Sequence, residues 1–139
     1  MIISSTSRQF SQHHEACSDQ IPPAALPVAR KLRILLLKPF QKITAPLQAP
    51  PLGLLYITSS IREKLGRNVD IKIIDMKLQR MKPEEIVGIL KEYEPDVVGF
   101  SALNYEAHAG HCIAKQIKQH NPSIITVFGG PYALKNTKT

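Results

Sequence analysis

The chain has little of what several functional classes require. It contains no tryptophan, only two cysteines (Cys17 and Cys112) and no apolar run long enough to cross a bilayer. The two cysteines have no paired spacing and indicate neither a disulfide framework nor a cluster site. The first residues lack the apolar segment of a secretory signal, and a mitochondrial presequence would be richer in arginine. We therefore expect a cytoplasmic protein that does not enter a membrane.

Acidic residues are scarce relative to basic ones. Lys and Arg number 18 against 11 Asp and Glu, which gives a formal charge of +7. A positive chain can attract nucleic acid or an anionic cofactor. The basic residues are scattered, however, as at Lys115, Lys118, Lys135 and Lys138, and no aromatic residues are interleaved with them. This distribution favours a solvated basic surface, and we expect no nucleic-acid partner.

Residues 1–30 differ from the rest of the chain. They are rich in Ser, Gln, His and Pro and show no sustained periodicity, so we predict a disordered leader, and nothing in it marks a functional segment. From Lys31 onward the pattern becomes regular. We predict a single domain over residues 31–134, followed by a C-terminal tail of residues 135–139.

Short β-branched runs alternate with amphipathic stretches over this domain. Strands are predicted over 32–37, 69–75, 97–101 and 124–128, and helices over 51–65, 83–93 and 105–120. The spacing in the first helix predicts a buried face of Leu54, Ile57, Ile61 and Leu65. The alternation implies right-handed crossovers and an α/β, doubly wound, flavodoxin- or Rossmann-like fold with a parallel sheet in the order 2-1-3-4.

The predicted sheet places two small-residue turns at its carboxyl edge. Ser101-Ala102-Leu103-Asn104 follows the third strand, and Gly129-Gly130-Pro131 follows the fourth. Ligands of open parallel sheets bind outside this edge, and small residues let a flat or extended ligand approach the backbone. These seven residues are therefore our candidates for a binding site. In the alternative interpretation they are only the tight-turn residues of an α/β sheet.

The fourth strand is the last one that the pattern predicts. A fifth strand and its helix would normally cover it, so its bare apolar edge is an association hazard. The chain therefore looks like a truncated protein, or like a domain that borrows its missing edge from a partner. Self-association through the exposed fourth strand is one such arrangement.

Four segments resemble the cobalamin-binding domain at the N-terminus of cobalamin-dependent radical S-adenosylmethionine enzymes. The resemblance covers about residues 31–134 and is carried by Ala49–Tyr56, Ile73–Asp75, Pro95–Ser101 and Val127–Pro131. It implies that the two turns line the slot for the nucleotide tail of the cofactor. The hydroxyl of Ser101 would bond a ring nitrogen, Leu103 would pack on the ring, and the glycines would leave room for the tail.

The resemblance thus implies a cobalamin-binding module that holds a corrinoid for a separate radical enzyme or methyltransferase domain. Methionine-synthase-like and mutase-like relatives carry Asp-x-His-x-x-Gly after the first strand, but Lys38–Thr44 contains no His. Base-off cobalamin without a protein His ligand is therefore implied. The Cys-x-x-x-Cys-x-x-Cys motif of the radical enzymes is also missing, so we expect no iron–sulfur cluster and no catalytic residue in this chain.

Other residue groups support weaker alternatives. His108 and His111, next to Cys112, have a spacing that can chelate a metal, but no third ligand is evident. Asp75 could meet a ribose hydroxyl, although no Gly-x-Gly-x-x-Gly follows the first strand. A flavodoxin-like protein-interaction domain or a truncated remnant, each without cofactor, stays open as an alternative. A receiver domain is disfavoured because Lys38 stands where its acidic residues would cluster.

Overall fold

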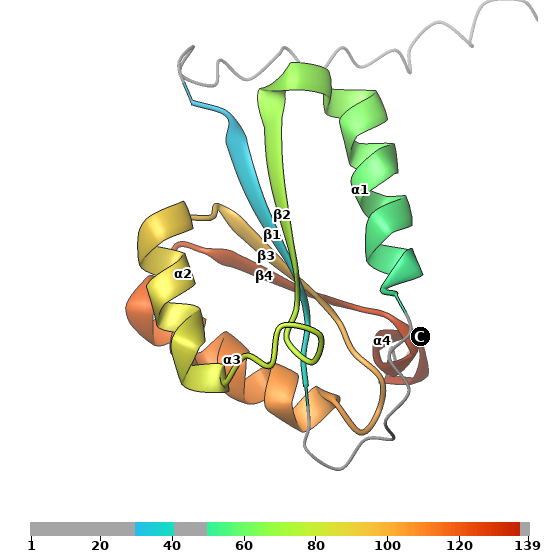
Figure 1. Cartoon of the computed structure of the whole chain (residues 1–139), viewed down its shortest axis with the longest axis vertical. Coiled ribbons are helices and arrows are strands. Elements are labelled where there is room, and N and C mark those ends of the chain that lie inside the picture. The colour runs from blue at the N-terminus through green and yellow to red at the C-terminus, as the bar shows by residue number, and fades with distance from the viewer. Residues whose placement is uncertain (1–29, 41–49, 137–139) are drawn as a thin grey trace, which may run out of the picture. The chain divides into compact units, whose positions relative to one another are not determined.

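The computed structural model describes residues 30–40 and 50–136 of the chain (Figure 1). The elements in order are β1 (Leu32–Lys38), α1 (Leu52–Leu65), the 3₁₀ turn η1 (Gly66–Asn68), β2 (Val69–Asp75), the 3₁₀ turn η2 (Pro83–Glu85), α2 (Ile86–Tyr93), β3 (Val97–Ser101), α3 (Ala107–His120), β4 (Ile125–Gly129) and α4 (Pro131–Asn136). This alternation confirms the predicted α/β class. No helix in the described part is long and apolar enough to cross a membrane.

The four strands form one parallel sheet in the order β2-β1-β3-β4, as the sequence predicts. In the central strand, Leu36 pairs with Ile73 of β2 on one side and with Gly99 of β3 on the other. At the end of the β3–β4 pair, Ser101 lies opposite Gly129. Because the strands are parallel and these two end in register, the turns that follow them leave the sheet side by side.

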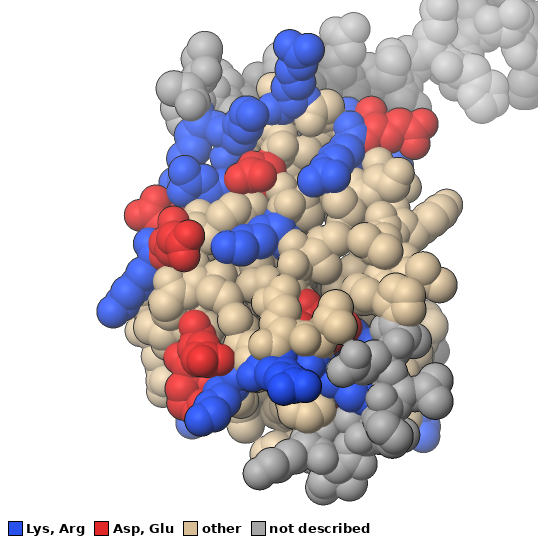
Figure 2. Space-filling model, in the orientation of Figure 1, with Lys and Arg blue, Asp and Glu red and all other residues tan. Residues whose placement is uncertain are grey.

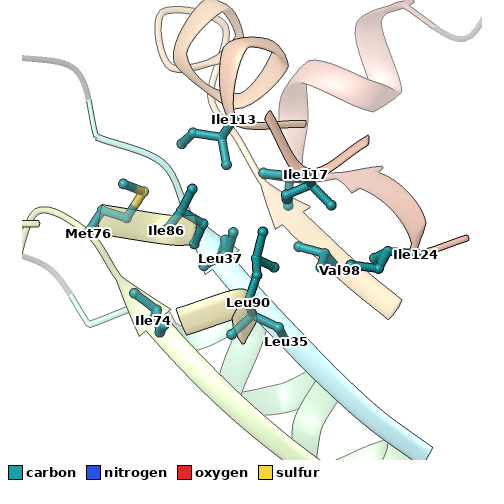
Figure 3. Packing of buried hydrophobic residues seen from close by; sticks show 11 residues of the cluster. Leu35, Leu37, Ile74, Met76, Ile86, Leu90, Val98, Ile113, Ile117 and Ile124 are labelled. Atoms are coloured by element: carbon teal, nitrogen blue, oxygen red, sulfur yellow. The ribbon is translucent and has the colours of Figure 1, made fainter. Parts of the chain in front are cut away.

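Two hydrophobic clusters cover the two faces of the sheet, and residues of β1 alternate between them. The larger cluster lies between the sheet and helices α2 and α3, and Figure 3 shows among its members Leu35, Leu37, Ile74, Ile86, Leu90, Val98, Ile113, Ile117 and Ile124. The smaller cluster includes Ile34, Leu36, Leu54, Val69 and Ile71, with Leu54 contributed by α1. Cover on both faces explains why β1 is a continuous apolar run.

Helix α1 packs through a different stripe from the one predicted. Leu54 and Thr58 are buried and Ile61 is half-buried, whereas Ile57 and Leu65 are exposed. Thr58 is accommodated on the inner face because its hydroxyl donates a hydrogen bond to the carbonyl oxygen of Leu54 at 2.8 Å. The prediction that Ile57 and Leu65 are buried is therefore wrong.

Two helices begin later than their sequence signals indicate. The third helix begins at Ala107 rather than at residue 105, because Glu106 first closes a turn with Leu103 through backbone and side-chain hydrogen bonds. Pro83–Glu85 is the turn η2, so α2 itself starts three residues after the predicted proline. Both differences arise at helix entry, where 3₁₀ and β-turns are common.

The last described elements also depart from the predicted ones. β4 starts one residue later than predicted, because the N–H of Ile124 donates back to the carbonyl oxygen of Asn121 and that of Ile125 makes the first bond toward β3, to the carbonyl oxygen of Asp96. Helix α4 is not predicted from the sequence at all, and it crosses the expected boundary between the domain and the tail. Pro131 at its first position was the available signal, since a helix start tolerates the missing N–H.

β4 is an edge strand of the described sheet, and one of its faces is open. Ile125 and Val127 share a face with Ile34 and Leu36, because the pairing register places them in line across β3. Helix α1 packs beside β2 on this face. Ile125 and Val127 are 57% and 49% exposed. The apolar edge expected from the sequence is therefore present in the described part of the fold.

Polar contacts tie the start of β1 to the end of α2. The N–H of Arg33 donates to the carboxylate of Asp96 at 2.8 Å, and its guanidinium donates to the carbonyl oxygen of Tyr93 and to the carboxylate of Glu94 at 3.1 and 3.2 Å. Burial raises the pKa of the Tyr93 hydroxyl from 10.0 to about 12, and the negative charge of Asp70 adds to this rise.

Tyr93 should therefore make stability depend on pH in the alkaline range. The folded state holds the phenolic proton more tightly than the unfolded chain does, so this contribution is complete below pH 10.0 and is lost as the pH rises toward about 12. After allowance for solvent around this half-buried ring, the loss is on the order of 1 kcal/mol. Urea unfolding across this interval should show a shallower decline in Tyr93→Phe. Equal slopes in the two proteins would contradict the assignment.

Candidate functional site

The turns after β3 and β4 are joined by backbone hydrogen bonds. The N–H of Ala102 donates to the carbonyl oxygen of Gly129 at 3.3 Å, and the N–H of Tyr132 donates to the carbonyl oxygen of Ala102 at 3.3 Å. These bonds continue the strand pairing beyond its last pair, Ser101 and Gly129. The structure therefore brings the two predicted turns together at one point of the carboxyl edge.

The two glycines of the second turn are there for different reasons. Gly130 has a φ of +81°, and a Cβ there would lie 3.0 Å from the carbonyl oxygen of Ala102 and 3.4 Å from Oγ of Ser101. Its own backbone therefore requires a glycine. At Gly129 a Cβ would meet only the carbonyl oxygen of Phe100, at an ordinary contact distance of 3.6 Å. The fold could accept a side chain at Gly129, and the sequence supplies none.

Ser101 and Ala102 present different groups to this junction. Ser101 is half-buried, and its hydroxyl makes no hydrogen bond within the part of the chain that the structure describes. Ala102 is only 1% exposed, so it contributes its backbone rather than its side chain. Pro131 is exposed at the start of α4. The junction thus offers a hydroxyl beside a turn that has no side chain.

Leu103 and Asn104 lie on the turn that leads from β3 to α3, where Leu103 is half-buried and Asn104 is exposed. The turn is closed by Glu106, which was not among the predicted site residues. The carboxylate of Glu106 accepts a hydrogen bond from the N–H of Leu103 at 3.0 Å, and its own N–H donates to the carbonyl oxygen of Leu103 at 2.9 Å. Glu106 is 5% exposed. The sequence carries no capping-box signature for this role, because Leu103 stands where such a box has Ser or Thr.

The structure does not assemble the metal site considered from the sequence. Nε2 of His111 lies 3.0 Å from the hydroxyl of Tyr132, so the His111 ring contacts helix α4. His108 lies near Cys112 instead, with 3.7 Å between Nε2 and Sγ. Among residues 30–40 and 50–136, no three His, Cys, Asp or Glu side chains gather into a group that could hold a metal ion. The pairing of His108 with His111 as metal ligands is therefore not supported.

The carboxyl ends of β1 and β2 form another part of the same edge. Oδ1 of Asp75 accepts hydrogen bonds from the N–H groups of Lys77 and Leu78 at 3.0 and 3.1 Å. Oδ2 lies 3.7 Å from Nζ of Lys38. Both oxygens are used within the protein, where they shape the turn after β2 and neutralise a lysine. This use argues against the ribose contact considered for Asp75.

Charged side chains do not form a single basic surface on the face shown in Figure 2. Lys and Arg are spread over this face, with Asp and Glu among them and uncharged residues between. Such a mixed pattern is typical of a solvated surface. It agrees with the scattered distribution of basic residues along the sequence.

Ligands of open α/β sheets bind outside the carboxyl ends of the strands, which is the edge at which this sheet carries its two joined turns. The chain belongs to the B12-binding domain family, whose model matches residues 41–136. It is also 36% identical over 83 residues to the uncharacterized methyltransferase PH0819 of Pyrococcus horikoshii. That match covers 60% of this chain and 17% of the length of the relative. No solved structure matches the chain.

Proposed function

We propose that this chain holds a corrinoid at the carboxyl edge of its sheet and presents it to a separate catalytic domain. Gly129 carries the proposal. Its backbone would accept a side chain, with a Cβ 3.6 Å from the nearest atom, the carbonyl oxygen of Phe100, yet β4 ends there without one. The interpretation of the turn as a purely structural feature explains Gly130 but leaves Gly129 unexplained. Room for an extended ligand group along the backbone explains it.

The residues of the junction fit the nucleotide tail of cobalamin. The hydroxyl of Ser101, which makes no hydrogen bond among the described residues, would bond a ring nitrogen of the tail. The half-buried Leu103 would pack on the ring, and Gly129 would leave the path open. The remaining members of the proposed site are Ala102, which acts through its backbone, Asn104, Gly130 and Pro131.

The proposed corrinoid would be base-off, with no protein His on its cobalt. The sequence Lys38–Thr44 has no His where related proteins carry the cobalt ligand, and the structure describes this segment as far as Phe40. The bound corrinoid would supply the group-transfer chemistry. The residues of this chain would bind and orient it, and none of them is proposed to be catalytic.

The proposed partner is a radical S-adenosylmethionine enzyme domain or another methyltransferase domain. The similarity to a protein named as a methyltransferase supports a methyl-transfer setting. An iron–sulfur cluster, if the partner uses one, would be held by the partner's cysteines, because this chain has only two. We propose that the module acts in the cytoplasm.

Anaerobic titration of the purified chain with hydroxocobalamin tests the proposal. After desalting, the visible spectrum should show a retained chromophore with a base-off signature, both before and after reduction. A base-on spectrum would contradict the proposed coordination.

Absence of retained colour from a chain that unfolds cooperatively would refute cobalamin binding. It would favour an interaction domain that self-associates through β4, where Ile125 and Val127 are exposed. Sedimentation at rising protein concentration would then show whether this association occurs without cofactor.

A further inference from the structure

One side chain of α3 contacts the residues on both sides of the Gly129–Gly130 turn. The ring of His111 stacks on Phe128, which precedes the turn, with centroids 4.6 Å apart and 22° between the ring planes. Nε2 of His111 lies 3.0 Å from the hydroxyl of Tyr132, which follows the turn. The His111 and Tyr132 rings also meet edge to face, with centroids 5.6 Å apart. His111 therefore bridges the two ends of the turn.

The Phe128 ring, on which His111 stacks, is held in place by several contacts. Phe100 of β3 stacks on it, with centroids 4.6 Å apart and ring planes 12° apart. A Cβ at Gly110 would lie 3.0 Å from Cε1 of Phe128, so the missing side chain lets α3 approach the end of β4 closely. The Phe128 ring is thus held by Phe100, by His111 and by the backbone of α3.

Tyr132 connects the same bridge to the turn after β3. Its N–H donates to the carbonyl oxygen of Ala102, the residue whose own N–H donates to Gly129. Helix α4 is only six residues long, too short to be stable by itself. Its first turn therefore depends on contacts with the rest of the fold, and the contact with His111 is one that the structure shows.

We propose that His111 and Tyr132 are positioning residues that clasp the Gly129–Gly130 turn against Ala102 and thereby set the affinity of the site for its ligand. The inference rests on the proposed function. Two consecutive glycines have more backbone freedom than any other pair of residues. Ordering such a turn on binding costs conformational entropy and weakens affinity. A turn that is already ordered before binding avoids this entropy cost, so the clasp should raise affinity without contacting the ligand.

Amide hydrogen exchange in the ligand-free chain tests the clasp itself. In His111→Leu, exchange at the amides of Tyr132 and Ala102 should become at least about fivefold faster, because one lost hydrogen bond of average strength already gives that factor and the ring contacts are lost as well. Tyr132→Phe loses the hydroxyl but keeps the ring contacts. Exchange at the same two amides should therefore also become faster, but by a smaller factor. His120→Leu, at the far end of α3 and exposed, is the matched control and should change neither amide.

Affinity for hydroxocobalamin tests the consequence. His111→Leu should bind about fivefold more weakly than the wild type at a temperature at which both chains are fully folded, whereas His120→Leu should bind as the wild type does. Unchanged exchange at Tyr132 and Ala102 would overturn the clasp. Faster exchange with unchanged affinity would overturn its effect on binding. A wild-type chain that binds no cobalamin would refute the proposed function and this effect together, and the exchange rates would still decide whether the clasp exists.

Discussion

Replacement of Gly129 with leucine is expected to abolish the retention of cobalamin while the sheet stays folded. Gly129 is the last residue of β4, and its φ is not in the left-handed region that Gly130 occupies. A Cβ there meets only the carbonyl oxygen of Phe100, at 3.6 Å, so the strand can carry the new side chain. The rest of the leucine would fill the space proposed for the nucleotide tail, and the affinity should fall by at least about a hundredfold.

The measurement is retained visible absorbance after desalting, together with the thermal unfolding midpoint of each protein. Gly88→Leu is the matched control, because Gly88 lies on helix α2 rather than in the turns after β3 and β4, and a Cβ there meets nothing within 4 Å. This control should retain cobalamin as the wild type does. Full retention by a folded Gly129→Leu protein would place the tail elsewhere and remove the main support for the proposed slot.

The sheet was predictable from the sequence because its signals are local. β2 and β3 have the predicted bounds, since turn residues and polar residues flank each apolar run. The strand order also follows from the alternation of strands with helices, because right-handed crossovers leave few topologies. The buried face of α1 was predicted less well. Apolar spacing cannot show that a hydroxyl such as that of Thr58 would occupy the inner face by bonding to Leu54.

The meeting of the two turns was predictable for a similar reason, but the way in which they are joined was not. Ser101 and Gly129 could be placed at one edge because parallel strands end together. Which glycine the backbone requires is decided by the positive φ of Gly130 and by the approach of Ala102 from the turn after β3, and the sequence has no signal for this approach. The contact of His111 with Tyr132 likewise depends on how α3 meets α4, a helix that the sequence pattern did not reveal.

Replacement of Gly130 with alanine is expected to cause a large loss of stability, unlike the replacement of Gly129, which should leave the sheet folded. The φ of +81° is strained for any residue with a Cβ, and this strain costs about 1–3 kcal/mol. The added Cβ would also lie 3.0 Å from the carbonyl oxygen of Ala102 and 3.2 Å from its nitrogen. Such overpacking against backbone costs about 1–3 kcal/mol more. The sum, about 2–6 kcal/mol, is a large fraction of the stability of a small domain.

Urea unfolding of Gly130→Ala and Gly129→Ala, compared with the wild type, measures this difference. Gly129→Ala should unfold within about 1 kcal/mol of the wild type, because its Cβ meets only an ordinary contact. Equal losses of stability in the two variants would show that the turn is not built as described. Loss of cobalamin in Gly130→Ala would follow from a distorted junction whether or not a ligand path runs there. Gly129 is therefore the position at which a binding defect in a folded protein reports on the ligand path itself.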